Sequence, residues 1–352
     1  MSSNNKISFL LGSKTKDGFV PLFDELRNPI EGKRLYILKG GPGSGKSSLM
    51  KRIIMILEEK NHSIEYFHCA SDPDSLDAFI DYDSGIAMVD GTAPHIMEPE
   101  YPGAYDIIIN MADCWDDTSL IQNKIDIISL SDTISSYHNM ATACISSAAA
   151  LLDNNIRMAR PYIRNDVIND FVAMLIEDLK GSKPGKVKKR LLSAVSVGET
   201  VFFSDTIKVL SKTIYVIPDI WGAASDILLA RLYQEASNLS LDQIVCYCSI
   251  RTPNKIDHLI FPSAGITVST NNVFHSISDH NLTIIPDLMK PIPESIHEQM
   301  SLHLNKSVDL IDMAGGHIKR AKLLHDDLEA FYVKAMDFSK VNLIYDKIMK
   351  EI

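Results

Sequence analysis

The sequence predicts an α/β protein in which a parallel sheet with flanking helices occurs twice in tandem, each lobe being followed by a helical segment. Three observations predict this fold class. Short apolar runs alternate with helical patterns near the start of the chain, several of these runs recur about 180 residues later, and a glycine-rich turn joins one apolar run to a helix. Strands that alternate with helices are typical of parallel sheets, because parallel strands need a crossover connection.

Strands are expected at the short apolar runs, and helices at the amphipathic stretches between them. The run from Asp106 to Ala112 is too short to cross a bilayer and is expected to be a buried strand. From Thr118 to Lys180 the pattern is helical, and Pro161 should kink or break the helix. The expected strands cover residues 35–39, 64–69, 86–90 and 106–110, and the first expected helices cover 46–60 and 74–81.

A near-constant offset between similar segments indicates an internal duplication. Residues 34–38 are echoed by 213–217, an offset of 179, and His95 is echoed by His275, an offset of 180. A constant offset over several segments is the pattern that duplicated lobes leave. The other matching pairs are 64–69 with 244–248, 71–77 with 251–257, 84–89 with 264–269, and the helical tails 149–156 with 321–328.

The stretch from Lys180 to Arg190 is rich in Lys, Gly and Pro and is interpreted as a solvated linker between the lobes. Its basic residues leave a phosphate or nucleic-acid contact as the alternative. The expected organisation is a nucleotide-binding lobe with an intact loop, a helical segment, a second lobe with a degenerate loop, and a C-terminal helical segment. The corresponding ranges are 1–117, 118–182, 183–300 and 301–352.

Composition limits the classes of function. The 352 residues carry 35 basic and 45 acidic side chains, a net charge of −10, which disfavours nucleic acid as a partner. No signal peptide and no apolar run of membrane-spanning length is evident, so we expect a cytoplasmic protein without a membrane partner. Two of the five cysteines form a Cys246-x-Cys248 pair, for which neighbouring strand positions are a simpler interpretation than a metal site. The other cysteines are Cys69, Cys114 and Cys144.

The segment from Gly40 to Ser47 fits the phosphate-binding pattern G-x-x-x-x-G-K-[ST]. Its glycines let the backbone N–H groups turn toward phosphate oxygens, and the following helix adds the positive end of its dipole. We expect Lys46 to reach the β- and γ-phosphates and Ser47 to bind Mg²⁺. The lobe is therefore expected to resemble P-loop NTPases. The expected nucleotide-binding residues are Gly40, Gly41, Pro42, Gly43, Ser44, Gly45, Lys46, Ser47 and Ser48.

An acidic residue at the end of a buried strand should complete the metal site. Asp90 ends the apolar run 86–90 and is expected to hold Mg²⁺ together with Ser47, unless it only caps the turn that follows. Asp72, Asp74 and Asp77 should lie near the same sheet edge, where open α/β sheets bind ligands. For Asp74, a helix cap before Leu76 is the preferred interpretation.

The residues that would support hydrolysis are less clearly marked. Many ATPases place Glu after the strand-end Asp, but here Gly91 follows, so Glu98 and Glu100 are the nearest carboxylates, and Glu98 is assigned with Lys46 and Asp90 to catalysis. His95 is either a γ-phosphate contact or a structural turn residue. A helical cluster of arginines is expected to form a solvated or acid-paired face rather than to reach the nucleotide. Its members are Arg157, Arg160 and Arg164.

The second lobe has lost the phosphate-binding loop. On the offset of 179, Gly43 corresponds to Gly222 and Lys46 to Ser225, while Asp226 takes the place of Ser47. Asp219 and Trp221 also enter this segment, and a carboxylate at a helix N-terminus competes with phosphate. We therefore expect the second lobe to be a structural or regulatory partner.

Several segments together resemble a bacterial, Firmicutes-type family of ATP-binding proteins with tandem P-loop domains, found mainly in Gram-positive anaerobes and spore formers. The resemblance is most specific over residues 34–115 and implies a cytosolic P-loop NTPase; members often keep a second loop, from which this chain departs. The segments are 39–50, 68–77, 89–95 and 102–106.

The expected function is Mg²⁺-dependent ATP binding at one site in the N-terminal lobe, with ATP hydrolysis as the leading activity. A small-molecule or nucleotide kinase and a non-catalytic ATP-dependent switch or scaffold are the alternatives. The expected ligands are ATP and Mg²⁺, with a further small-molecule or protein partner that the residues do not identify. ATP is preferred over GTP because no Asn-Lys-x-Asp run follows a strand.

Overall fold

The structure is a computed structural model that describes residues 6–251, 255–278, 282–285 and 288–352. The chain divides into two compact units, each described here by itself. Unit 1 comprises residues 1–20, 142–195 and 199–315, and unit 2 comprises 21–141, 196–198 and 316–352. Two six-stranded mixed sheets flanked by helices confirm the prediction of duplicated α/β lobes. Among the described residues, no helix is long and apolar enough to cross a membrane.

Unit 2 holds five strands of the first sheet, in the order β5-β6-β7-β4-β8. β4 pairs in parallel with β7 on one side and with β8 on the other, which places β4 inside the sheet. β6 pairs antiparallel with β5 and β7, so the sheet is mixed rather than entirely parallel. The strands are β4 (Arg34–Lys39), β5 (Ile64–Cys69), β6 (Asp72–Asp81), β7 (Ile86–Asp90) and β8 (Asp106–Asn110).

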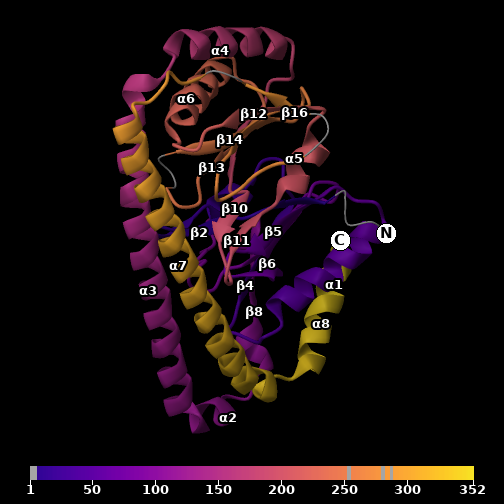
Figure 1. The fold of residues 1–352 in the computed structure, drawn as a ribbon. Coiled ribbons are helices and arrows are strands. Elements are labelled where there is room, and N and C mark those ends of the chain that lie inside the picture. The colour runs from indigo at the N-terminus through magenta and orange to yellow at the C-terminus, as the bar shows by residue number, and fades with distance from the viewer. Residues whose placement is uncertain (1–5, 252–254, 279–281, 286–287) are drawn as a thin grey trace. The chain divides into compact units, whose positions relative to one another are not determined.

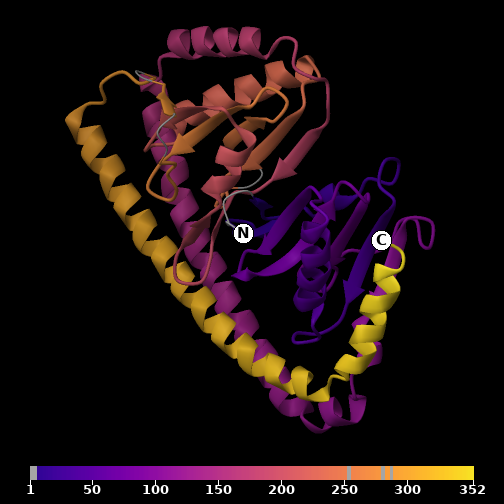
Figure 2. The same ribbon diagram turned by 90° about the vertical axis from the view of Figure 1, so that its right-hand side faces the viewer.

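Helices α1 (Lys46–Glu59) and α8 (Phe338–Met349) pack in the core of unit 2. In Figures 1 and 2 the yellow α8 runs beside the indigo α1, and the two helices are in contact. The apolar face of α1 (Leu49, Met50, Ile53, Leu57) is buried against the sheet, which fixes the start of α1 at the end of β4. Short helices complete the unit: η2 (Phe23–Leu26), η3 (Met111–Cys114) and α2 (Asp117–Gln122).

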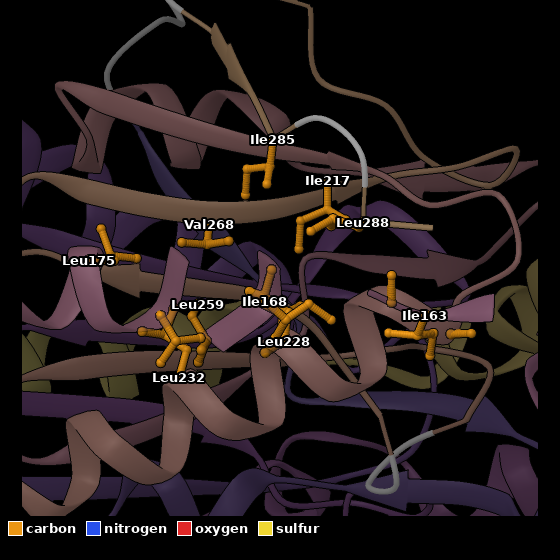
Figure 3. Close-up of a cluster of buried hydrophobic side chains, with 14 of the residues drawn as sticks. Ile163, Ile168, Leu175, Ile217, Leu228, Leu232, Leu259, Val268, Ile285 and Leu288 are labelled. Carbon is orange, nitrogen blue, oxygen red and sulfur yellow. The ribbon is translucent and has the colours of Figure 1, made fainter. Parts of the chain in front are cut away.

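Unit 1 repeats the arrangement around the second sheet, whose order is β16-β12-β15-β14-β13-β9. Its main core lies between this sheet and helices α4 and α6, and Figure 3 shows side chains such as Leu175, Leu228 and Val268 converging there. The helices are α4 (Asn165–Leu179), α5 (Ser204–Leu210) and α6 (Ala223–Asn238). The sheet strands are β9 (Val187–Arg190), β12 (Thr213–Pro218), β13 (Gln243–Tyr247), β14 (Ile256–Phe261), β15 (Ile266–Asn271) and β16 (Leu282–Ile284), and the remaining strands are β1 (Ile7–Phe9), β2 (Gly12–Thr15), β3 (Gly18–Pro21), β10 (Ser193–Val195) and β11 (Thr200–Phe202).

Two long helices contribute residues to both units. They are α3 (Lys124–Ala159) and α7 (Glu294–Ala335), and the unit boundary falls after Ala141 in α3 and after Gly315 in α7. The predicted break at Pro161 is confirmed, because α3 ends at Ala159 and the 3-10 turn η4 (Arg160–Tyr162) separates it from α4.

The structure corrects three local predictions. Residues 74–81 are not a helix but part of strand β6, because pairing with β5 and β7 prevails over the capping pattern before Leu76. β8 is not a buried strand but an alternating one at the sheet edge, with Ile108 49% exposed. The stretch 180–190 is not a linker throughout, because β9 pairs with β13 and Arg190 is buried. Of the segment 251–257, residues 252–254 lie outside the described residues.

The thiols agree with the absence of a disulfide framework. All five cysteines are free, and Cys114 and Cys246 are buried. Cys246 lies within β13 and Cys248 directly follows that strand, so both cysteines lie at the carboxyl end of β13.

Candidate functional site

The glycine-rich loop connects the inner strand β4 to helix α1. Gly43 (φ +67°) and Gly45 (φ +85°) both have left-handed backbone conformations, which residues with side chains rarely adopt. Gly45 is also the residue that caps the N-terminus of α1, so the loop delivers the chain directly into the helix. The loop therefore faces the positive end of the α1 dipole.

Two backbone N–H groups of the loop are available to an incoming acceptor. Within the described part of the chain, the N–H groups of Gly43 and Lys46 have no hydrogen-bond acceptor. Both belong to a loop turned toward a helix N-terminus, where N–H groups bind anions. The loop thus offers donors for an anionic ligand.

The Lys46 side chain folds back over the loop. Its Nζ donates to the carbonyl oxygens of Gly40 at 2.7 Å and Gly41 at 2.8 Å. Nζ also lies 3.5 Å from Oδ2 of Asp90, and the Lys46 side chain is only 9% exposed. The ammonium group is thereby fixed beside the loop and next to the carboxylate that ends β7.

The sheet register explains the approach of Asp90. Parallel pairing sets Asp90 opposite Leu38, just before the loop begins. Thr92 then joins the two segments: its N–H donates to Asp90 Oδ1 at 2.9 Å, and its hydroxyl donates to the carbonyl oxygen of Gly40 at 2.9 Å. Sequence patterns did not single out Thr92, since its partner Gly40 is 52 residues away.

Asp77 adds a second, more deeply buried carboxylate. The residue is 6% exposed, and its neighbour Leu76 donates its N–H to the hydroxyl oxygen of Ser47 at 3.0 Å. Burial raises the pKa of Asp77 to about 6; His95 opposes this shift, and the negative charge of Asp90 adds to it. Asp77, Asp90 and the Ser47 hydroxyl therefore supply oxygen ligands of the kind that Mg²⁺ prefers.

His95 is held by two neighbours. Its Nε2 lies 3.4 Å from Oδ2 of Asp77, and its ring packs on Phe23 with centroids 4.8 Å apart. The corresponding His275 of unit 1 is buried and bonded to Thr270 at 2.8 Å. Both histidines thus have structural partners, and His95 also adjoins the carboxylates of the site.

Glu98 and Glu100 are directed to other partners. Glu98 pairs with Lys39 at 2.6 Å and its side chain is 69% exposed. Glu100 lies 3.4 Å from the guanidinium of Arg27. Among the described residues, no hydrogen bond or ion pair connects Glu98 or Glu100 to Lys46 or Asp90.

Helix α7 packs beside the loop, which the sequence did not predict. A Cβ placed on Gly41 would lie 2.7 Å from Cε1 of Tyr332, and one placed on Gly43 would lie 2.8 Å from the carbonyl oxygen of Glu329. Any larger residue at either position would collide with α7. Sequence patterns did not reveal this contact, because the two segments are almost 300 residues apart.

In unit 1 the corresponding loop binds a carboxylate of its own chain. Asp219 accepts hydrogen bonds from the N–H groups of Gly222 at 2.9 Å and Ser225 at 2.7 Å. Gly222 is the N-cap of α6 and has a left-handed conformation (φ +75°), so its structural counterpart is Gly45, the N-cap of α1, rather than the Gly43 that the offset of 179 predicts. The predicted intrusion of Asp219 is therefore observed as a direct occupation of the helix N-terminus.

Charged residues surround the substituted loop. Lys255, only 5% exposed, packs over Gly222 and pairs with Asp257. Burial alone would raise the pKa of Asp257, but the Lys255 ammonium together with His275 and His258 outweighs burial and holds it below its ordinary value. Of the three arginines, Arg160 pairs with Asp226 at 3.4 Å. An acid-paired arginine face is what we expected for this helical segment.

The comparisons with known proteins concern the part of the chain that carries this loop. Residues 21–80 match the family model Nephrocystin 3, N-terminal. The match runs from the end of β3 through β4, the loop, α1 and β5 into β6, and it covers less than half of the chain. No match was found among curated proteins or solved structures. The chain is thus similar to this family over the loop-bearing segment.

Proposed function

We propose that unit 2 binds Mg²⁺-ATP at the loop Gly40–Ser47 and hydrolyses it. The observation that carries this proposal comes from the duplication. In unit 1 the N–H groups of Gly222 and Ser225, at the N-cap and the third residue of α6, bind the Asp219 carboxylate, whereas those of Gly45 and Ser48, at the same positions of α1, have no acceptor within the described residues. The same backbone geometry that binds an internal anion in one unit is available to an external anion in the other.

The surrounding side chains fit a nucleotide carrying a divalent cation. Lys46 supplies a fixed ammonium group, and Ser47, Asp77 and Asp90 supply oxygen atoms. Mg²⁺, when bound, would be held by Ser47 and Asp90 and would supply positive charge that neutralises the phosphate oxygens, with Asp77 as a further carboxylate beside it. A cation at this position would also favour ionised Asp77, whose charged form is disfavoured by burial and by Asp90.

For hydrolysis we assign the water-positioning role to Asp77 in place of Glu98. Asp77 lies beside Asp90 with a pKa near neutrality, while Glu98 is paired with Lys39 on the surface. Water oxygen would bond to the γ-phosphorus as the bond to the β–γ bridging oxygen breaks, and Asp77 would accept the water proton. Lys46 would stabilise the charge on the transferred group.

The test is magnesium-dependent phosphate release from ATP by the purified chain, together with nucleotide binding. Lys46→Ala should abolish both release and binding, and Lys39→Ala is the matched control, because it removes a lysine of the same unit that pairs with Glu98. Excess GTP as a competitor reports base preference. Unchanged binding in Lys46→Ala would overturn the proposed site.

A non-catalytic switch is the second candidate, because Gly91 rather than Glu follows Asp90 and Glu98 is directed away. The Asp77→Asn variant separates the two candidates. A catalytic Asp77 predicts that this variant binds ATP and loses phosphate release, by about 100-fold or more. ATP binding by the unaltered chain with no magnesium-dependent release would establish the switch.

A further inference from the structure

The segment of α7 from Lys322 to Val333 packs against the main chain of the loop, at its glycines. Gly41 meets the Tyr332 ring, and Gly43 meets the main chain of Glu329 and the side chain of Val333. These positions leave no room for a side chain, so a movement of the loop toward α7 would displace the helix. The position of this α7 segment is therefore coupled to the conformation of the loop.

The same α7 segment and the end of α7 also contact other residues of unit 2. Tyr332 packs edge-on against Trp115, with ring centroids 5.6 Å apart. At the end of α7, Asp116 donates its N–H to Ala335 at 2.9 Å and Asp337 donates its N–H to Cys114 at 2.7 Å. These bonds fix the end of α7, so movement caused at the loop is directed into the preceding turns.

Tyr332 lies at the end of the loop where a γ-phosphate would be recognised. Its ring meets Gly41, and the carbonyl oxygen of Gly41 accepts a hydrogen bond from Lys46 Nζ at 2.8 Å. Lysine at this position of the motif contacts the β- and γ-phosphates. Loss of the γ-phosphate would consequently change the contacts of Lys46, Gly41 and Tyr332 first.

The α7 segment also meets the carboxylate side of the site. Lys322 lies 3.4 Å from Asp72 and pairs with Asp326 on its own helix. Lys322, Glu329 and Tyr332 are spaced by seven and three residues and so share one face of α7.

We propose that this face of α7 distinguishes triphosphate from diphosphate on the loop, by taking a different position in the two states. The inference rests on the proposed nucleotide site and adds its regulation. Residues 294–315 of the same continuous helix belong to unit 1. The nucleotide state of unit 2 would therefore reach unit 1 through one covalent element, which gives the duplicated chain a route for ATP-dependent signalling.

The experiment is backbone hydrogen exchange on the full chain with saturating Mg²⁺-ADP or Mg²⁺-ATPγS. Binding of each nucleotide is measured in the same samples by displacement of a fluorescent ADP. We expect exchange over residues 322–335 to differ by about fivefold or more between the two nucleotides, and exchange over α8 to stay the same. Equal exchange over 322–335 with both nucleotides bound would overturn the inference. Absence of binding would instead refute the proposed site.

A variant provides an independent measurement. Tyr332→Ala should change the ratio of triphosphate to diphosphate affinity by about fivefold, because coupling between helix and nucleotide is reciprocal. Leu343→Ala is the control, since Leu343 lies on α8 and is 69% exposed. An unchanged ratio in folded Tyr332→Ala would contradict the proposal. Should that variant not fold, hydrogen exchange of the unaltered chain decides.

Discussion

The carboxylate of Asp219 accepts a hydrogen bond from the backbone N–H of Ser225 at 2.7 Å, at the start of helix α6. Ser225 is the third residue of α6, the position that Ser48 holds in α1 of the other unit. The duplicated chain has thus kept the anion-binding backbone in both units, but it has filled one of them with its own carboxylate. Unit 1 consequently has a constant internal anion, and under the proposed function only the loop of unit 2 would respond to a phosphate.

Asp219→Ala should destabilise unit 1 by about 1–2 kcal/mol, the range measured for losing a helix cap. The variant leaves the N–H groups of Gly222 and Ser225 without their acceptor. Urea unfolding followed by circular dichroism gives the free energy. Asp205→Ala is the control, because Asp205 is exposed and pairs with Lys208 on the same helix. Equal stability of the two variants would contradict the anion role of Asp219, and nucleotide binding by unit 2 should be unaffected in both.

Asp77→Asn should stabilise the chain at pH 7.5 in the absence of nucleotide and Mg²⁺. The folded-state pKa of Asp77 is about 6, above its ordinary value of 3.8. The folded state therefore holds a proton more tightly, and this stabilisation is lost as pH rises through 6. A shift of this size corresponds to about 3 kcal/mol, so we expect a gain of about 1–3 kcal/mol. The gain should shrink at pH 5.

Urea unfolding at the two pH values measures this effect, with Asp74→Asn as the control because Asp74 is exposed on the same strand. A gain of the same size in both variants would show that the charge of Asp77 is not the cause.

Gly43→Ala tests the contact between the loop and α7. The substitution combines a left-handed conformation with a Cβ only 2.8 Å from the carbonyl oxygen of Glu329. Gly103→Ala is a matched control, because Gly103 also has a positive φ (+76°) but nothing lies within 4 Å of its Cβ position. We expect about 1 kcal/mol of destabilisation for Gly103→Ala and at least about 1 kcal/mol more for Gly43→Ala. Chemical unfolding gives both values, and equal costs would argue against close packing of α7 on the loop.

Much of the candidate site followed from local patterns in the sequence. A strand, a glycine-rich turn and an amphipathic helix predicted β4, the loop and α1, and an apolar run ending in Asp predicted β7. The structure brings Lys46 and Asp90 to within 3.5 Å because β7 pairs with β4, and a parallel sheet collects strand ends at one edge. The pattern of apolar residues locates each strand in the sequence. The pairing of adjacent parallel strands then brings their ends together.

The errors arose where distant pairing overrides local preference. Asp72 to Ser75 has the composition of a helix cap, yet β6 is built there because strands on both sides bind its backbone. Arg190 ends a basic stretch that reads as a linker, yet pairing with Cys246 buries it. The approach of Tyr332 to Gly41 depends on how α7 packs, and no local pattern specifies which loop a helix face will meet.

Acid should weaken unit 1 through two buried histidines. His258 is 1% and His275 6% exposed, and burial lowers the pKa of both below the ordinary 6.5. As pH falls through 6.5 the unfolded chain binds these protons while the folded chain does not, so stability is complete above 6.5 and declines below it. Each histidine should contribute a positive slope of at most about 1.4 kcal/mol per pH unit below pH 6.5.

His275→Gln should therefore reduce that slope, by at most about 1.4 kcal/mol per pH unit, whatever its effect on stability at pH 7.5. The slope is the decisive quantity, because Gln cannot titrate while loss of the bond to Thr270 acts at every pH. Asp77 in unit 2 contributes a slope of opposite sign, so hydrogen exchange of the β14 and β15 amides should be used to report on unit 1. His297→Gln, which changes an exposed histidine of the same unit, should leave the slope unaltered. If His275→Gln also leaves it unaltered, the acid sensitivity of unit 1 does not come from this buried ring.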